Sequence, residues 1–195
     1  MKKLVSFLAA LCLFLATIEN AIPKPLPFLR LGLANLPVLL ALYLLPRRNI
    51  LHLVLFKVVA QGIISGTLFS YVFLFSAAGS FSSALAMIIL YELFGRRSIT
   101  EITNKRKLFS VSAIGISLFG SLASTFAQLF LARFILFGEN AKYIAPILLV
   151  SGLITGLLLG IFAELFMQKS NWFKGLLTDF SETATKSDVE KSDEI

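Results

Sequence analysis

Residues 51–66 read LHLVLFKVVAQGIISG, an apolar run with a cation, Lys57, at its centre. Gln61 follows about one helical turn later, and the glycines Gly62 and Gly66 stand just beyond it. A charged side chain is costly inside the hydrocarbon of a bilayer, so it usually faces a cavity or a partner group. The stretch therefore predicts a membrane helix that carries polar groups at depth.

The composition of the whole chain is that of a membrane protein. Of its 195 residues 57% are hydrophobic, and the mean hydropathy is +0.85, well outside the usual range of soluble domains. A membrane span needs roughly 20 mostly apolar residues. Six stretches come close to that length, so we expect an all-α, polytopic protein with six transmembrane helices. Their expected limits are 4–22, 31–45, 50–69, 79–94, 110–137 and 143–167. The second and fourth are short, which favours burial among their neighbours.

These spans leave no room for a separate soluble domain. We expect a membrane domain over residues 1–168 and a cytoplasmic segment over residues 169–195. That segment starts with an interfacial anchor around Trp172 and continues as a polar tail from Thr178, whose composition predicts disorder. The first stretch also resembles a signal peptide, but Glu19 stands where a cleavage site needs a small residue, which favours an uncleaved helix.

Basic residues near span ends are retained on the cytoplasmic side of a membrane. With the N-terminus inside, thirteen of the 18 Lys and Arg residues fall in inner segments, three in outer segments, and Lys57 and Arg133 lie within spans or at their edges. This asymmetry predicts a plasma-membrane protein with both termini in the cytoplasm. The net charge of +7 then follows from topology and does not indicate nucleic-acid binding.

The sequence lacks the motifs of the common membrane-associated enzymes. All three aspartates, Asp179, Asp188 and Asp193, are in the tail, so no span presents paired carboxylates for Mg²⁺ and a diphosphate. There is no nucleotide-binding G-x-x-x-x-G-K-[ST] loop, no H-E-x-x-H and no G-x-S-x-G, and a single cysteine and a single histidine give no metal site. We therefore expect a non-catalytic subunit without a cofactor. Uphill transport would need an ion gradient or a partner ATPase.

Polar residues at depth converge on the expected outer half of the membrane. These candidate substrate-binding residues are Glu19, Arg30, Asn35, Lys57, Gln61, Gln128 and Arg133. Three cations against one carboxylate favour an anionic or amphipathic solute. Each residue also has a structural interpretation: Lys57 could snorkel to the inner interface or pair with Glu164, the arginines could be interfacial anchors, and the amides could join helices by hydrogen bonds.

Small residues recur at a spacing of four, which lets membrane helices approach closely. Gly152, Gly156 and Gly160 form such a ridge, and so do Gly62 with Gly66. A third ridge consists of Ala113, Ser117 and Ser121. Near the N-terminus, Ser6 and Ala10 leave a smaller notch that would dock either a helix of this chain or a separate membrane subunit.

The order of several motifs resembles that of a known family. They are RLGLANLPVLLALYLL (30–45), QGIISGTLFS (61–70), FLFSAAGSFSSALAM (73–87) and VSAIGISLFGSLASTFAQLFLA (111–132), followed by a glycine-ridged last helix. Together they resemble the Gx transporter family over about residues 4–167. Members are often labelled heptaprenyl diphosphate synthase component I and look like substrate-binding S components of energy-coupling factor transporters.

The resemblance implies a six-helix bundle with an outward-facing pocket, a transmembrane coupling protein and a pair of cytoplasmic ATPases. Asn35, Lys57 and Gln128 match polar positions of the family. The fifth helix departs from the pattern, because STFAQ replaces the expected H-N-x-x-Q and keeps only Gln128. The function this favours is substrate binding for a small-molecule uptake transporter.

Two rival interpretations remain. In one, the chain is a non-catalytic membrane component associated with heptaprenyl diphosphate synthesis. In the other, it is a scaffold that recruits an electron-transfer or lipid-biosynthetic enzyme through the loop GRRSITEITNKRK (95–107) and the tail.

Overall fold

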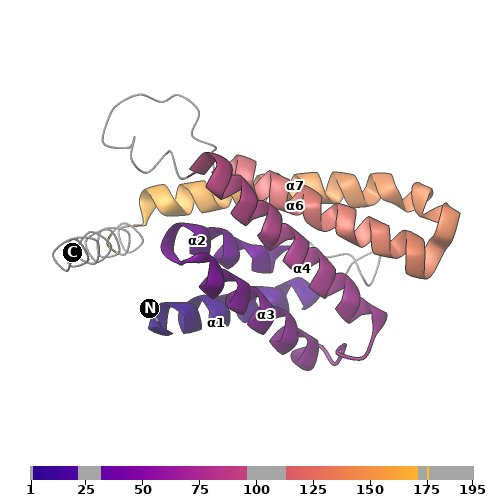
Figure 1. Cartoon of the computed structure of the whole chain (residues 1–195), viewed down its shortest axis with the longest axis horizontal. Helices are drawn as coiled ribbons and strands as arrows, with labels where there is room; N and C mark the ends of the chain where they lie inside the picture. The colour runs from indigo at the N-terminus through magenta and orange to yellow at the C-terminus, as the bar shows by residue number, and fades with distance from the viewer. Residues whose placement is uncertain (1, 22–31, 96–112, 171–174, 176–195) are drawn as a thin grey trace, which may run out of the picture.

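The structure is a computed structural model that describes residues 2–21, 32–95, 113–170 and 175. Within these ranges the chain is all helical, which confirms the predicted fold class, and it contains no β-strand (Figure 1). The α-helices are α1 (Lys2–Ala21), α2 (Leu36–Leu44), α3 (Arg47–Ile64), α4 (Tyr71–Leu90), α6 (Ala113–Leu131) and α7 (Ala141–Lys169). Short 3₁₀ segments form η1 (Leu33–Asn35) and η4 (Gly138–Asn140), and π-helical segments form η2 (Tyr91–Gly95) and η3 (Ala132–Phe137).

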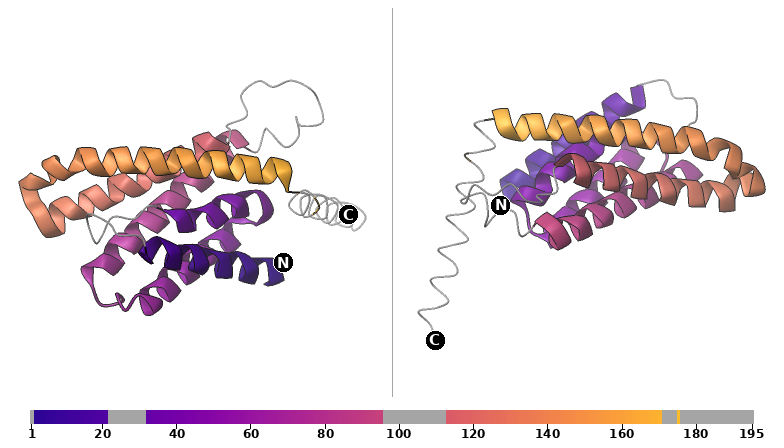
Figure 2. Two further views of the ribbon diagram at one scale, coloured as in Figure 1. Left: turned by 180° about the vertical axis from the view of Figure 1, so that it is seen from behind. Right: turned by 90° about the horizontal axis from the view of Figure 1, so that it is seen from above.

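Two continuous helical runs of the described residues are long and apolar enough to cross a membrane, Tyr71–Leu93 and Ala113–Lys169. The second run reverses at Gly138, whose φ of 52° lies in the left-handed region that glycine adopts readily. It is therefore a hairpin in which α6 and α7 lie side by side, as both views of Figure 2 show. Leu4–Glu19 and Leu33–Leu44 are shorter apolar helices.

The α6–α7 hairpin is held together by the predicted glycine ridge on α7. A Cβ atom added at Gly160 would lie 2.5 Å from the Cα atom of Ile114. Cβ atoms at Gly152 and Gly156 would collide with hydroxyls of α6, on Thr125 and Ser121. Because each glycine lacks a side chain, the two backbones approach closely, and the close-packing prediction for this ridge is confirmed.

The short helix α2 is buried on nearly all sides, as expected for a helix that does not face lipid. The fourth stretch was also expected to be a short helix, and this was wrong, because α4 starts at Tyr71, well before the expected residue 79. Ser70 begins α4, because its Oγ accepts a hydrogen bond from the backbone N–H of Val72 at 3.3 Å. Gly66 is also not a packing position: it lies beyond the end of α3, in the turn, with a φ of +64°.

Candidate functional site

The segment η1 lies at the centre of the candidate site and is anchored by a carboxylate from α1. Gly32 precedes it with a φ of 81°, a backbone conformation that lets the chain turn into α2 without strain. Glu19, which is 2% exposed, accepts a hydrogen bond from the backbone N–H of Leu33 through Oε2 at 2.9 Å. A buried carboxylate near the end of α1 therefore fixes the start of η1.

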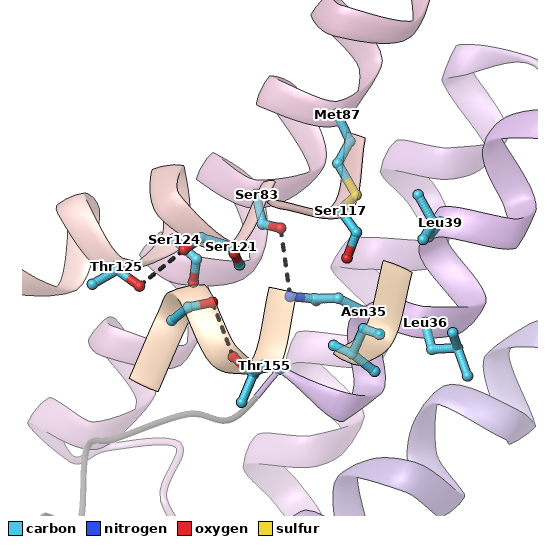
Figure 3. Close-up of a pocket in the computed structure, with 13 residues that line it drawn as sticks. Asn35, Leu36, Leu39, Ser83, Met87, Ser117, Ser121, Ser124, Thr125 and Thr155 are labelled. Atoms are coloured by element: carbon cyan, nitrogen blue, oxygen red, sulfur yellow. Dashed lines mark hydrogen bonds between the residues drawn. The ribbon is translucent and has the colours of Figure 1, made fainter. Parts of the chain in front are cut away.

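Lys57 connects η1 to α3. Its side chain is 3% exposed, and its Nζ donates a hydrogen bond to Oδ1 of Asn35 at 2.5 Å. The Nδ2 of Asn35 in turn donates to Oγ of Ser83 on α4 at 3.4 Å (Figure 3). Asn35 thus joins the α3 cation to the α4 hydroxyl. Because the ammonium is buried against η1, it does not snorkel to an interface.

The two predicted glutamines are buried on the inner faces of their helices. Gln128 of α6 is 3% exposed, and its Nε2 donates to Oγ of Ser124 at 3.2 Å. Both side chains pack on Gly79 of α4, where an added Cβ would lie 2.8 Å from each polar atom. Gln61 is buried about one turn beyond Lys57 on the same face of α3.

A cavity beside Asn35 is lined by hydroxyl groups that the sequence interpretation did not assign to the site. Its volume is about 20 Å³, which is enough for roughly one water molecule. The polar side chains around it, shown in Figure 3, are Asn35, Ser83, Ser117, Ser121, Ser124, Thr125 and Thr155.

The signal for these groups was present in the sequence. Ser117, Ser121, Ser124 and Gln128 recur at intervals of four, three and four, which places them on one face of α6. The spacing of Ser117 and Ser121 predicts close helix packing, and the structure adds that both line the cavity. Packing is also real, because the hydroxyl of Ser117 donates to the backbone carbonyl of Gly156 at 2.8 Å.

The remaining predicted residues do not join this cluster. Arg133 is on η3, exposed, and its Nη2 lies 3.2 Å from Oε1 of Glu139. It lines a different hollow, so the expected convergence of Arg133 with Lys57 was wrong. Arg30 lies outside the described residues. Ser6 and Ala10 are exposed on α1, so no helix of the described part covers that notch.

The described part of the chain is thus an all-helical bundle with two apolar helical runs long enough to cross a membrane and a buried polar cluster that joins η1, α3 and α4, a combination that fits a membrane protein. Over residues 8–166 the sequence matches the family model described as heptaprenyl diphosphate synthase component I, and the chain belongs to that family. The predicted resemblance to the Gx transporter family, which carries this label, is confirmed, and the protein is a membrane protein of the Gx type. No curated protein and no solved structure matches the chain.

Proposed function

We propose that this protein is the substrate-binding membrane subunit of a small-molecule uptake transporter. The observation that carries the proposal is the buried ammonium of Lys57, held by Asn35 next to a hydroxyl-lined cavity. A lysine at the centre of a membrane helix costs about 2.5–3.5 kcal/mol on insertion scales. An apolar residue would fill the same space without this cost, so the cation is best explained by a ligand that uses it.

The chain would cross the membrane six times, with α1, α3, α4, α6 and α7 as five of the spans and the shorter η1–α2 segment, Leu33–Leu44, buried among them as the sixth. The distribution of Lys and Arg along the sequence supports this topology, with both termini in the cytoplasm. Figure 1 is consistent with it, because α1 begins and α7 ends at the same end of the bundle.

The cavity in this arrangement is water-sized, so a solute would enter only after the surrounding elements separate. The segment η1 is the natural part to move, since it has only three residues. It donates hydrogen bonds to Glu19 and Ser83 and accepts one from Lys57. A solute that replaced Asn35 as the partner of the ammonium would stabilise the opened arrangement. This coupling would link binding to a conformational change.

The chemistry of the cluster narrows the proposed solute. The expectation of an anion depended on three cations, and the structure separates Arg133 from Lys57. The described residues of the cluster offer one ammonium, one carboxylate and several hydroxyls. A small polar or amphipathic molecule with one acceptor group for Lys57, such as a carboxylate or carbonyl, fits this set best.

Energy for uptake would come from partners, since the sequence holds no nucleotide-binding loop. We propose a transmembrane coupling protein and a pair of cytoplasmic ATPases. The family description instead favours association with heptaprenyl diphosphate synthesis as a second candidate function. Purification of the native complex distinguishes the two: co-purifying ATPases support the transporter, and a co-purifying prenyl synthase supports the second candidate.

The site itself is tested by a ligand screen on the purified full-length protein. A bound solute should raise the thermal unfolding temperature, because a ligand that binds only the folded state stabilises it. Lys57→Met should abolish the increase, whereas Lys169→Met, which removes an exposed lysine at the end of α7, should leave it intact. Equal stabilisation of wild type and Lys57→Met would remove Lys57 from the site.

A further inference from the structure

The end of the α6–α7 hairpin contains a second hollow, of about 320 Å³, which we call the tip hollow. It is separate from the cavity beside Asn35 and is far roomier. Its charged and aromatic lining consists of Phe126, Phe130, Arg133, Glu139 and Lys142. Figures 1 and 2 show that this end of the hairpin projects beyond α1, α2 and α3.

The surface of α7 fixes the depth of the tip hollow in a bilayer. Large apolar side chains are exposed on α7 from residue 147 to residue 165, a length of about 27 Å at 1.5 Å per residue. This agrees with a hydrocarbon core about 30 Å thick. Lys142 and Tyr143 precede the apolar band by roughly 6–8 Å of helix, which is the depth of the headgroup layer. Exposed Tyr and Lys are typical of that layer.

The charges at the tip hollow favour a singly negative group. Arg133 is paired with the exposed carboxylate of Glu139 at 3.2 Å. The Nζ of Lys142 lies 5.2 Å from the ring centroid of Tyr143, so it stays oriented at the rim. Two cations and one carboxylate leave one net positive charge, which matches a phosphodiester.

An apolar track leads away from these charges along the hairpin. Phe126, Phe130 and Phe134 are spaced by four residues, and all three side chains are more than half exposed. The rings of Phe130 and Phe134 lie 4.5 Å apart between centroids. The stripe starts near the tip at Phe134 and runs about 12 Å along the hairpin toward the hydrocarbon core, so it is placed to lie against an acyl chain.

From this arrangement we infer that the tip hollow is a binding site for a phospholipid. The phosphate lies between Arg133 and Lys142, and one acyl chain follows the Phe126–Phe130–Phe134 stripe. This site goes beyond the proposed function and does not depend on it, because no residue of the tip hollow belongs to the Lys57 cluster. It gives Arg133 a role other than solute binding.

The test is native mass spectrometry of the full chain with added phosphatidylglycerol, and with diacylglycerol of the same chains as a lipid without phosphate. Arg133→Gln combined with Lys142→Gln should weaken phosphatidylglycerol binding about ten- to thirtyfold, from the usual contribution of two basic residues at a membrane surface. Diacylglycerol binding should not change. Arg48→Gln combined with Lys169→Gln removes the same charge from exposed positions outside the hollow, and should have less than a twofold effect.

Glu139→Gln supplies a change of opposite sign. It frees Arg133 from its carboxylate partner, so phosphatidylglycerol binding should become several times tighter, which a structural role for the ion pair would not produce. The inference is overturned if the two double variants weaken phosphatidylglycerol binding equally, or if Glu139→Gln weakens it. It is also overturned if inorganic phosphate binds the protein by itself and displaces the lipid at the concentration at which phosphate binds. The last result would assign the hollow to a free anion.

Discussion

Replacing Lys57 by Met separates the energetic roles of the buried cation. Methionine has a similar length and is apolar, so it fills the space of the lysine stem with little change in packing. The substitution removes an ammonium that is 3% exposed and that donates a hydrogen bond to Asn35. Two opposing terms decide the result.

Removing the charge relieves an insertion cost of about 2.5–3.5 kcal/mol. Loss of a hydrogen bond to a charged group costs about 1.5–3 kcal/mol. The net change in the free energy of unfolding should therefore lie between about 0.5 kcal/mol of destabilisation and about 2 kcal/mol of stabilisation. For a chain of this size that is a shift in unfolding temperature of at most about 8 °C.

Asn35→Leu gives the matched comparison, because it keeps the ammonium and removes one of its acceptors. This variant should be destabilised by about 1.5–3 kcal/mol. Both variants should be measured by thermal unfolding in the same detergent without added ligand. If Lys57→Met is destabilised more than Asn35→Leu, the lysine is held for stability, and the inference that a ligand explains its presence fails.

Three further outcomes are expected. Gly160→Ala should destabilise the hairpin by about 1–3 kcal/mol, since the new Cβ would lie 2.5 Å from a backbone atom of α6. Gly120→Ala should destabilise the protein less, because its new Cβ meets a flexible methionine side chain. Equal losses of thermal stability in the two variants would contradict this packing. Gly66→Ala has open space around it, so its cost should be only the roughly 1–2 kcal/mol of a left-handed residue, and a larger loss of stability would mean that the turn has unseen contacts. A photo-crosslinking side chain at Ser6 or Ala10, both exposed on α1, should attach to another membrane subunit in the native complex, whereas one at Ser65, beyond the end of α3, should not; no crosslink from either α1 position would show that no membrane partner covers this notch.

The polar residues show which parts of the candidate site can be predicted from the sequence. Lys57, Asn35 and Glu19 stand out as costly residues in apolar surroundings, and hydropathy alone marks them as candidates. Hydropathy does not mark the serines of α6 in the same way, because a hydroxyl in a membrane helix bonds to its own backbone and carries little cost. Thr125 illustrates this, since its hydroxyl donates to the carbonyl of Ser121 at 2.9 Å.

The sequence by itself determined the class of protein, the helical content and the tight α6–α7 contact, because composition sets the solvent a chain can tolerate and glycine at every fourth position sets how closely two helices approach. Only the tertiary structure decided which charges meet. Lys57 reaches Asn35 and not Arg133, because the turn at Gly32 brings Asn35 within reach of the lysine side chain of α3, while the hairpin carries Arg133 to its far tip. Position along a span gives the depth of a side chain, but its neighbours depend on the direction and rotation of the whole helix.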